Sequence, residues 1–119
     1  MGNLVKDKSF VFALKVVKVC RKLVKDEKEY VLSKQLLRSG TAIGALIREA
    51  EHGESTKDFI HKLAIALKEA NETEYWLELL HQSEYLESQE FQDLRNLAGE
   101  LNRLLISIIK STKKNNNIR

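Results

Sequence analysis

Residues 32–51 read LSKQLLRSGTAIGALIREAE, and residues 59–77 read FIHKLAIALKEANETEYWL. In both stretches the apolar or small residues recur every three or four positions, which places them on one side of an α-helix. In the first stretch these residues are Leu32, Leu36, Gly40, Ile43, Ile47 and Ala50. In the second they are Phe59, Leu63, Ala66, Ala70, Thr73 and Leu77. The middle of the chain therefore predicts two amphipathic helices, from about Tyr30 to Glu51 and from Ser55 or Thr56 to about Ser83.

Two more segments with the same periodicity flank this pair. The first runs from about Lys6 to Lys25, and its apolar stripe is predicted to be Phe10, Ala13, Val17, Cys20 and Val24. The last opens at Ser88, and its stripe is Leu94, Leu97, Leu101, Leu104 and Ile108. Four helices with short connections bury their stripes best as an antiparallel up-down bundle. We therefore predict one all-α four-helix bundle over residues 1–112, followed by a polar, basic and frayed tail over residues 113–119.

The composition agrees with this prediction. The 119 residues include no proline and only five glycines, so nothing interrupts long helices. A single cysteine cannot form an internal disulfide, and no apolar run reaches the ~18–20 residues that span a membrane. We expect a cytoplasmic protein without a membrane segment.

The charge is divided unevenly along the chain. Residues 1–50 hold 11 lysines and arginines against 5 acidic residues, whereas residues 51–100 hold 4 against 12. Residues 101–119 hold 5 basic residues and no acidic one. Such asymmetry indicates a basic and an acidic face, which serve either a nucleic acid or the pairing of subunits.

Little in the sequence indicates a reaction. The three histidines, His52, His61 and His81, lack the spacing of metal ligands, and Cys20 continues an apolar stripe with no base beside it. No glycine-rich loop could cradle a phosphate, and no acid–base pair stands out among the many carboxylates. We predict no metal, no cofactor and no enzymatic activity.

Two polar groups are candidates for a binding site. The first is a lysine stripe on one side of the first helix, which Arg21 borders: Lys15, Lys18, Lys22 and Lys25. It is either a solvated helix face or a surface for nucleic-acid phosphates. The second group is Gln35, Arg38 and Glu49 on the second helix. Arg38 lies either at a ligand or RNA site or in an ion pair between helices or subunits, for which Glu72 is a suitable partner.

The third helix carries more apolar residues than one core stripe needs. Ile65, Trp76 and Leu79 form a second seam, and the small residues Gly40 and Gly44 of the second helix let another backbone come close. These five residues predict the interface of a homo-oligomer. The alternative is that Trp76 covers the end of the core.

The block from Leu32 to Glu51 resembles a bacterial four-helix-bundle family whose members are encoded in intervening sequences of 23S rRNA genes, the S23 family. The matching residues are Gln35, Arg38, Ser39, Ile43, Ile47, Glu49 and Ala50. Two positions depart from the family pattern: Ala42 replaces a usual serine and Leu46 a usual asparagine. The resemblance implies a ring-like homopentamer with no established enzymatic activity. A family similar in fold, the accessory variability determinant of diversity-generating retroelements, is a basic pentamer that works with nucleic acid.

Two functions therefore remain open. The chain is either a homo-oligomer that binds structured RNA or DNA through its basic surface, or a structural protein–protein assembly module that binds no nucleic acid.

Overall fold

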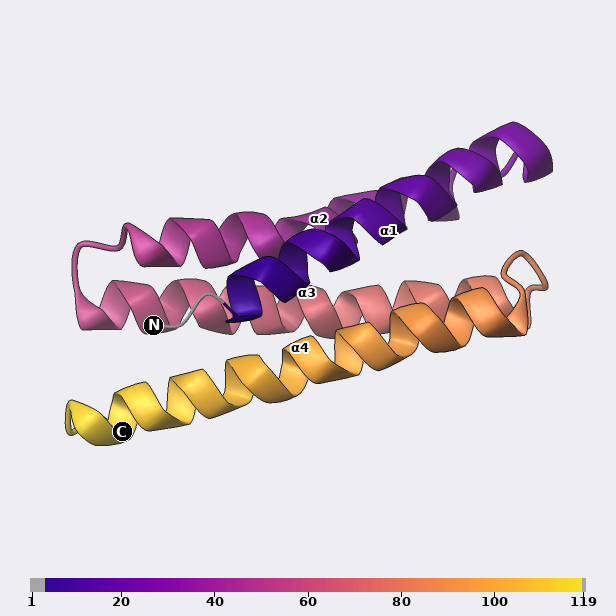
Figure 1. Cartoon of the computed structure of the whole chain (residues 1–119). Coiled ribbons are helices and arrows are strands. Elements are labelled where there is room, and N and C mark those ends of the chain that lie inside the picture. The colour runs from indigo at the N-terminus through magenta and orange to yellow at the C-terminus, as the bar shows by residue number, and fades with distance from the viewer. Residues whose placement is uncertain (1–3, 119) are drawn as a thin grey trace.

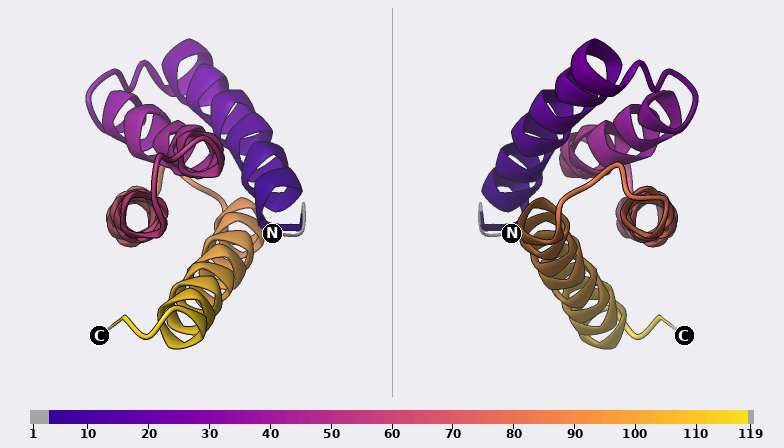
Figure 2. Two further views of the ribbon diagram at one scale, coloured as in Figure 1. Left: turned by 90° about the vertical axis from the view of Figure 1, so that its left-hand side faces the viewer. Right: turned by 90° about the vertical axis from the view of Figure 1, so that its right-hand side faces the viewer.

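Four long helices run up and down past one another in the computed structural model, which describes residues 4–118 (Figure 1). They are α1 (Leu4–Glu27), α2 (Leu32–Glu51), α3 (Thr56–Gln82) and α4 (Ser88–Asn115). Each helix packs on the next, and α1 also contacts α4, so the bundle closes. Viewed from its ends, the bundle has one helix at each corner (Figure 2). The predicted antiparallel four-helix bundle is confirmed.

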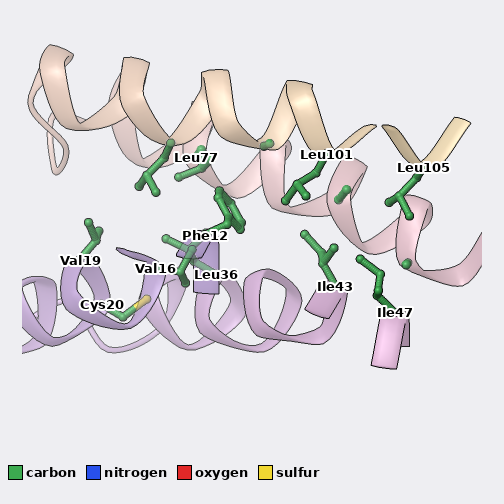
Figure 3. Close-up of a cluster of buried hydrophobic side chains, with 14 of the residues drawn as sticks. Phe12, Val16, Val19, Cys20, Leu36, Ile43, Ile47, Leu77, Leu101 and Leu105 are labelled. Carbon is green, nitrogen blue, oxygen red and sulfur yellow. The ribbon is translucent and has the colours of Figure 1, made fainter. Parts of the chain in front are cut away.

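The core lies along the bundle axis, where all four helices contribute buried aliphatic side chains (Figure 3). The predicted stripes of α2 and α3 face this core. The predicted stripe of α4 was correct in part, because Leu94 and Leu101 are buried while Leu97, Leu104 and Ile108 are only half-buried. Their fully buried members include Leu36, Ile43, Leu63, Leu77 and Leu101.

The predicted stripe of α1 was wrong. The buried residues of α1 are Val5, Ser9, Phe12, Val16, Val19, Cys20 and Leu23. Of the predicted set only Cys20 is buried, whereas Phe10 and Val24 are exposed. The physical reason is that α1 carries two apolar stripes with the same spacing of three and four residues. The stripe with Phe12 and Val16 enters the core (Figure 3), and the predicted one stays on the surface.

Side chains just outside α2 and α3 fix where these helices begin. The carboxylate of Glu29 accepts backbone N–H groups of Val31, Leu32 and Ser33, at 3.3, 3.1 and 2.8 Å. It therefore caps α2 from three residues before the first residue of the helix. At α3 the hydroxyl of Ser55 accepts the N–H of Asp58 at 3.0 Å, so Ser55 and not Thr56 is the cap.

The end of α4 lies beyond the predicted end of the bundle. The helix continues to Asn115, three residues past residue 112, and the hydroxyl of Thr112 donates to the carbonyl of Ile108 at 2.6 Å. Asn117 then takes a positive φ of 54°, and the Ile118 N–H bonds to the Lys113 carbonyl at 2.8 Å. These contacts close the helix, so the basic residues at 113 and 114 belong to its last turn. Arg119 lies outside the described residues.

Candidate functional site

The basic side chains predicted on α1 all lie at the surface. We call this group the cationic side of α1: Lys15, Lys18, Arg21, Lys22 and Lys25. Lys22 contacts Glu90 of α4 at 3.4 Å, a pair separated by 68 positions in the sequence. For the other four, no carboxylate within residues 4–118 lies at ion-pair distance.

The two lysines nearer the N-terminus of α1 differ from this group. Lys6 pairs with Glu51 of α2 at 3.2 Å, and Lys8 pairs with Glu100 of α4 at 2.9 Å. Both ion pairs join α1 to a neighbouring helix. The positive charge of α1 that is not compensated by a described carboxylate therefore concentrates in its C-terminal half.

Arg38 binds the two carboxylates on the facing helix α3. Its guanidinium contacts Glu69 at 3.2 Å and also contacts Glu72, which accepts the indole N–H of Trp76 at 2.9 Å. The side-chain carbonyl of Gln35 lies 3.5 Å from the Arg38 Nε. Two carboxylates thus compensate one arginine, which favours an ion pair between helices over an RNA contact at Arg38.

Glu49 does not join this cluster, although it was grouped with Arg38 on α2. Its carboxylate instead pairs with Lys62 of α3 at 2.9 Å. Arg38 is also not buried, because half of its side chain is accessible. The polar residues of α2 therefore form two separate links to α3, and both are partly exposed to water.

Gly40 and Gly44 face α1 within the same chain, which corrects the prediction that they lie at a subunit interface. A Cβ added at Gly40 would meet both methyl groups of Val16 at 3.0 Å. A Cβ at Gly44 would meet the hydroxyl of Ser9 at 3.3 Å. The two glycines let α1 and α2 approach closely, so their surface is used inside the bundle.

The outer surface between α1 and α2 carries a group of apolar side chains with cations among them. We call it the α1–α2 face, and its exposed or half-buried apolar residues are Phe10, Leu14, Val17, Val24, Tyr30 and Leu37. At the end of the bundle where α1 joins α2, it holds a hollow of about 450 Å³ lined by Val17, Val24 and Leu37. The periodicity of the sequence placed Phe10, Val17 and Val24 in the core and so gave no sign of this surface. A contiguous exposed apolar face on a small protein is typical of an interaction site.

The second seam of α3 is half-buried. Ile65, Trp76 and Leu79 each keep part of their surface accessible, and Trp76 packs against the edge of the core. Tyr75 is 59% exposed and meets the Trp76 ring edge-on, with 5.0 Å between ring centroids. The two alternatives for Trp76 are thus compatible, because it contacts the core on one side and solvent on the other.

Cys20 is buried, and its thiol donates to the backbone carbonyl of Ser33 at 3.3 Å. Burial, together with the nearby Glu29 carboxylate, raises the pKa of the Cys20 thiol from 9.0 to about 12. The thiol is therefore protonated near neutral pH, which does not suit a nucleophile.

We expect Cys20 to react with an aromatic disulfide at pH 8 far more slowly in the folded protein than in the unfolded chain. Absorbance follows the reaction. A pKa of about 12 in place of 9.0 leaves about a thousandfold less thiolate. The pKa of the thiol is 9.0 in the unfolded chain and about 12 in the folded protein. The protonated thiol therefore stabilises the fold fully below pH 9, and this contribution to stability is lost as the pH rises from about 9 towards 12. Equal rates with and without urea would contradict this assignment.

His81 lies in a hollow between the two hairpins that the sequence did not indicate. Its ring stacks on Phe91 with 4.1 Å between centroids, and its Nδ1 is buried without a hydrogen-bond partner in the described structure. The hollow is also lined by the carboxylates of Glu27, Glu84 and Glu87. Across residues 4–118, no group of three or more His, Cys, Asp or Glu side chains is arranged to hold a metal ion.

None of the four helices, as far as residues 4–118 describe them, has the length and apolar content that crossing a membrane requires.

Known proteins resemble this chain in sequence and in fold. Residues 2–107 match the family model described as 23S rRNA-intervening sequence protein. The chain is also similar to a protein of unknown function from the S23 ribosomal protein family of Bacteroides thetaiotaomicron VPI-5482, whose crystal structure was determined at 1.70 Å resolution. The two are 59% identical, with a TM-score of 0.88 over 89% of this chain and 98% of the other. No match was found among proteins with curated descriptions.

Proposed function

Because the chain belongs to the 23S rRNA-intervening sequence protein family, the S23 family, we propose that it is a non-enzymatic homo-oligomer that binds structured RNA or DNA. The binding surface is the cationic side of α1. The assembly is a ring, and five copies is the number that the family resemblance implies.

The observation that supports binding is the lack of compensating acid around Lys15, Lys18, Arg21 and Lys25. Elsewhere on α1, each of Lys6, Lys8 and Lys22 has a carboxylate at 2.9–3.4 Å. Cations at the surface bind phosphates by releasing counterions, and such contacts add affinity without reading sequence. A ring repeats these cations once per copy, so it offers more of them to a nucleic acid than a single copy of 13.7 kDa does.

We expect the wild-type protein to bind a labelled RNA hairpin and a DNA duplex in fluorescence anisotropy, with affinity that falls steeply between 50 and 200 mM salt. The double variant Lys15→Gln/Lys18→Gln removes two phosphate-binding cations per copy. Each cation that no longer meets a phosphate should make the slope of log affinity against log salt shallower by about 0.9.

The matched control is Lys6→Gln/Lys8→Gln, which removes the same charge from lysines that already have carboxylate partners. It should leave the slope nearly unchanged. Equal slopes in the two variants would place the binding elsewhere. If the wild-type oligomer binds neither nucleic acid at ~50 mM salt, where screening is weak, the protein is a structural assembly module.

A further inference from the structure

Two surfaces with accessible apolar side chains lie at the same end of the bundle. The α1–α2 face ends there, because α1 terminates and α2 begins at that end (Figure 1). The last turns of α3 lie there too, and they carry Tyr75, Trp76 and Leu79. The α1–α2 hairpin and the C-terminal half of α3 are therefore at the same height along the bundle axis.

The two faces carry opposite charge. Three cations, Arg21, Lys25 and Lys34, rim the hollow in the α1–α2 face, and no carboxylate lines it. From residue 69 to 82, α3 has four glutamates and no lysine or arginine: Glu69, Glu72, Glu74 and Glu78. Arg38 of the same chain contacts only two of these, Glu69 and Glu72. The charges around the hollow and those around Tyr75 are thus of opposite sign.

The hollow of the α1–α2 face and the Tyr75 side chain of α3 are also compatible in size. The lining of the hollow in the α1–α2 face includes the apolar side chains of Val17, Val24, Tyr30 and Leu37, and the hollow measures about 450 Å³, enough for an aromatic ring. Tyr75 is the most exposed aromatic side chain of α3, at 59%, and the Trp76 ring supports it from one side. A ring with an apolar body and a polar hydroxyl suits a pocket whose rim is charged.

We infer that the α1–α2 face of one copy binds the C-terminal half of α3 of the next copy, with Tyr75 in the hollow and the glutamates of α3 beside Arg21, Lys25 and Lys34. This inference rests on the proposed homo-oligomer and names the two surfaces that form it. The contact is heterologous, since the two surfaces differ.

The position of the two faces around the bundle explains why such a contact can close. The helices follow one another around the bundle, and α2 lies between α1 and α3 (Figure 2). The α1–α2 face and the outer side of α3 are therefore not back to back. In a head-to-tail contact between them, each copy is rotated relative to the previous one in the same direction. Repeated rotations of this kind can close into a ring. Arg21 and Lys25 of the cationic side of α1 then lie in the contact, whereas Lys15 and Lys18 do not line the hollow and remain for phosphates in every copy.

The test uses one substitution on each face and a matched control. Val24→Asp places a charge in the α1–α2 face, and Tyr75→Asp places one on α3. Ile106→Asp does the same on α4 away from both faces, and Ile106 is 40% exposed, like Val24. In sedimentation equilibrium, Val24→Asp and Tyr75→Asp should each reduce the mass to 13.7 kDa, whereas Ile106→Asp should keep the wild-type mass. Circular dichroism checks that all three remain helical.

Mixing the two dissociated variants gives a sharper result. Val24→Asp retains an intact α3 face, and Tyr75→Asp retains an intact α1–α2 face, so the mixture can form one contact and no more. We expect a complex of two copies that contains one of each variant. Two like faces meeting each other could not produce that complex. A mixture that stays monomeric would overturn the inference.

The outcomes separate this inference from the proposed function. A wild-type mass of 13.7 kDa would overturn the homo-oligomer and the inference together. An oligomer that persists in both Val24→Asp and Tyr75→Asp would overturn only the assigned surfaces. Loss of assembly in these variants, in a wild-type protein that binds no nucleic acid, would support the surfaces and reject nucleic-acid binding.

Discussion

Replacing Phe12 with alanine is expected to lower the free energy of unfolding by about 3–5 kcal/mol. Phe12 is fully buried, with 0% of its surface accessible, and its ring lies among core residues of the other helices (Figure 3). The truncation removes most of a ring and leaves a cavity that the long, closely packed helices cannot fill by small movements. Urea unfolding followed by the helical circular dichroism signal measures the change.

Phe10→Ala is the matched control, because it is the same substitution two residues earlier on α1. Phe10 is 51% exposed, and its ring packs under the guanidinium of Arg48 at 5.4 Å from the centroid. Removing this partly solvated contact should reduce stability by no more than about 1 kcal/mol. A decrease as large as that of Phe12→Ala would mean that α1 is rotated and that the apolar stripe predicted from the sequence faces the core after all.

This pair of residues shows how far periodicity determines a helical fold. In α2 the residues recurring every three or four positions form one main stripe, so the buried face could be predicted from spacing alone. In α4 the spacing identified Leu94 and Leu101 but not the buried Ala98 and Leu105. In α1, Phe10 and Phe12 belong to two stripes with the same spacing. The choice between them depends on which one fits the space left by the other three helices, and that information is not local.

Some features of the candidate site could likewise be predicted from spacing, and others could not. The exposure of Lys15, Lys18 and Lys25 could be predicted because a lysine-rich side of an amphipathic helix faces solvent. The pairing of Lys22 with Glu90 could not, because it depends on how α4 packs beside α1. For Arg38, the residue types narrowed its partner to a carboxylate on the facing helix, and Glu72 contacts it. The second partner, Glu69, follows from the helical turn that places it beside Glu72.

The two glycines of α2 also predicted only part of the helix packing. The spacing of Gly40 and Gly44 predicts that another backbone comes close, since four residues bring two positions to one side of a helix. It does not tell which backbone this is, and the structure shows that it is α1 of the same chain. We therefore propose the apolar stripe of α1 that the core does not use as a surface for assembly.

Replacing Gly40 with valine is expected to lower the free energy of unfolding by about 1–3 kcal/mol through overpacking. A Cβ at this position would lie 3.0 Å from both methyl groups of Val16, closer than normal contact, and valine adds two further carbons. Val16 is fully buried and β-branched, so its side chain has one strongly preferred rotamer in a helix and cannot turn away. Helix α1 would have to move outward from α2.

Two comparisons in the same urea experiment isolate this cause. Gly99 also lies within a helix, but a Cβ there would meet only the flexible end of Arg103, at 3.4 Å. Gly99→Ala should therefore stabilise the protein by up to about 1 kcal/mol, the difference in helix propensity. Combining Gly40→Val with Val16→Ala provides space where the clash occurs, so the double variant should be destabilised by less than the sum of the two single effects. Additive effects would show that Gly40 and Val16 do not meet, and the close packing of α1 on α2 would have to be abandoned.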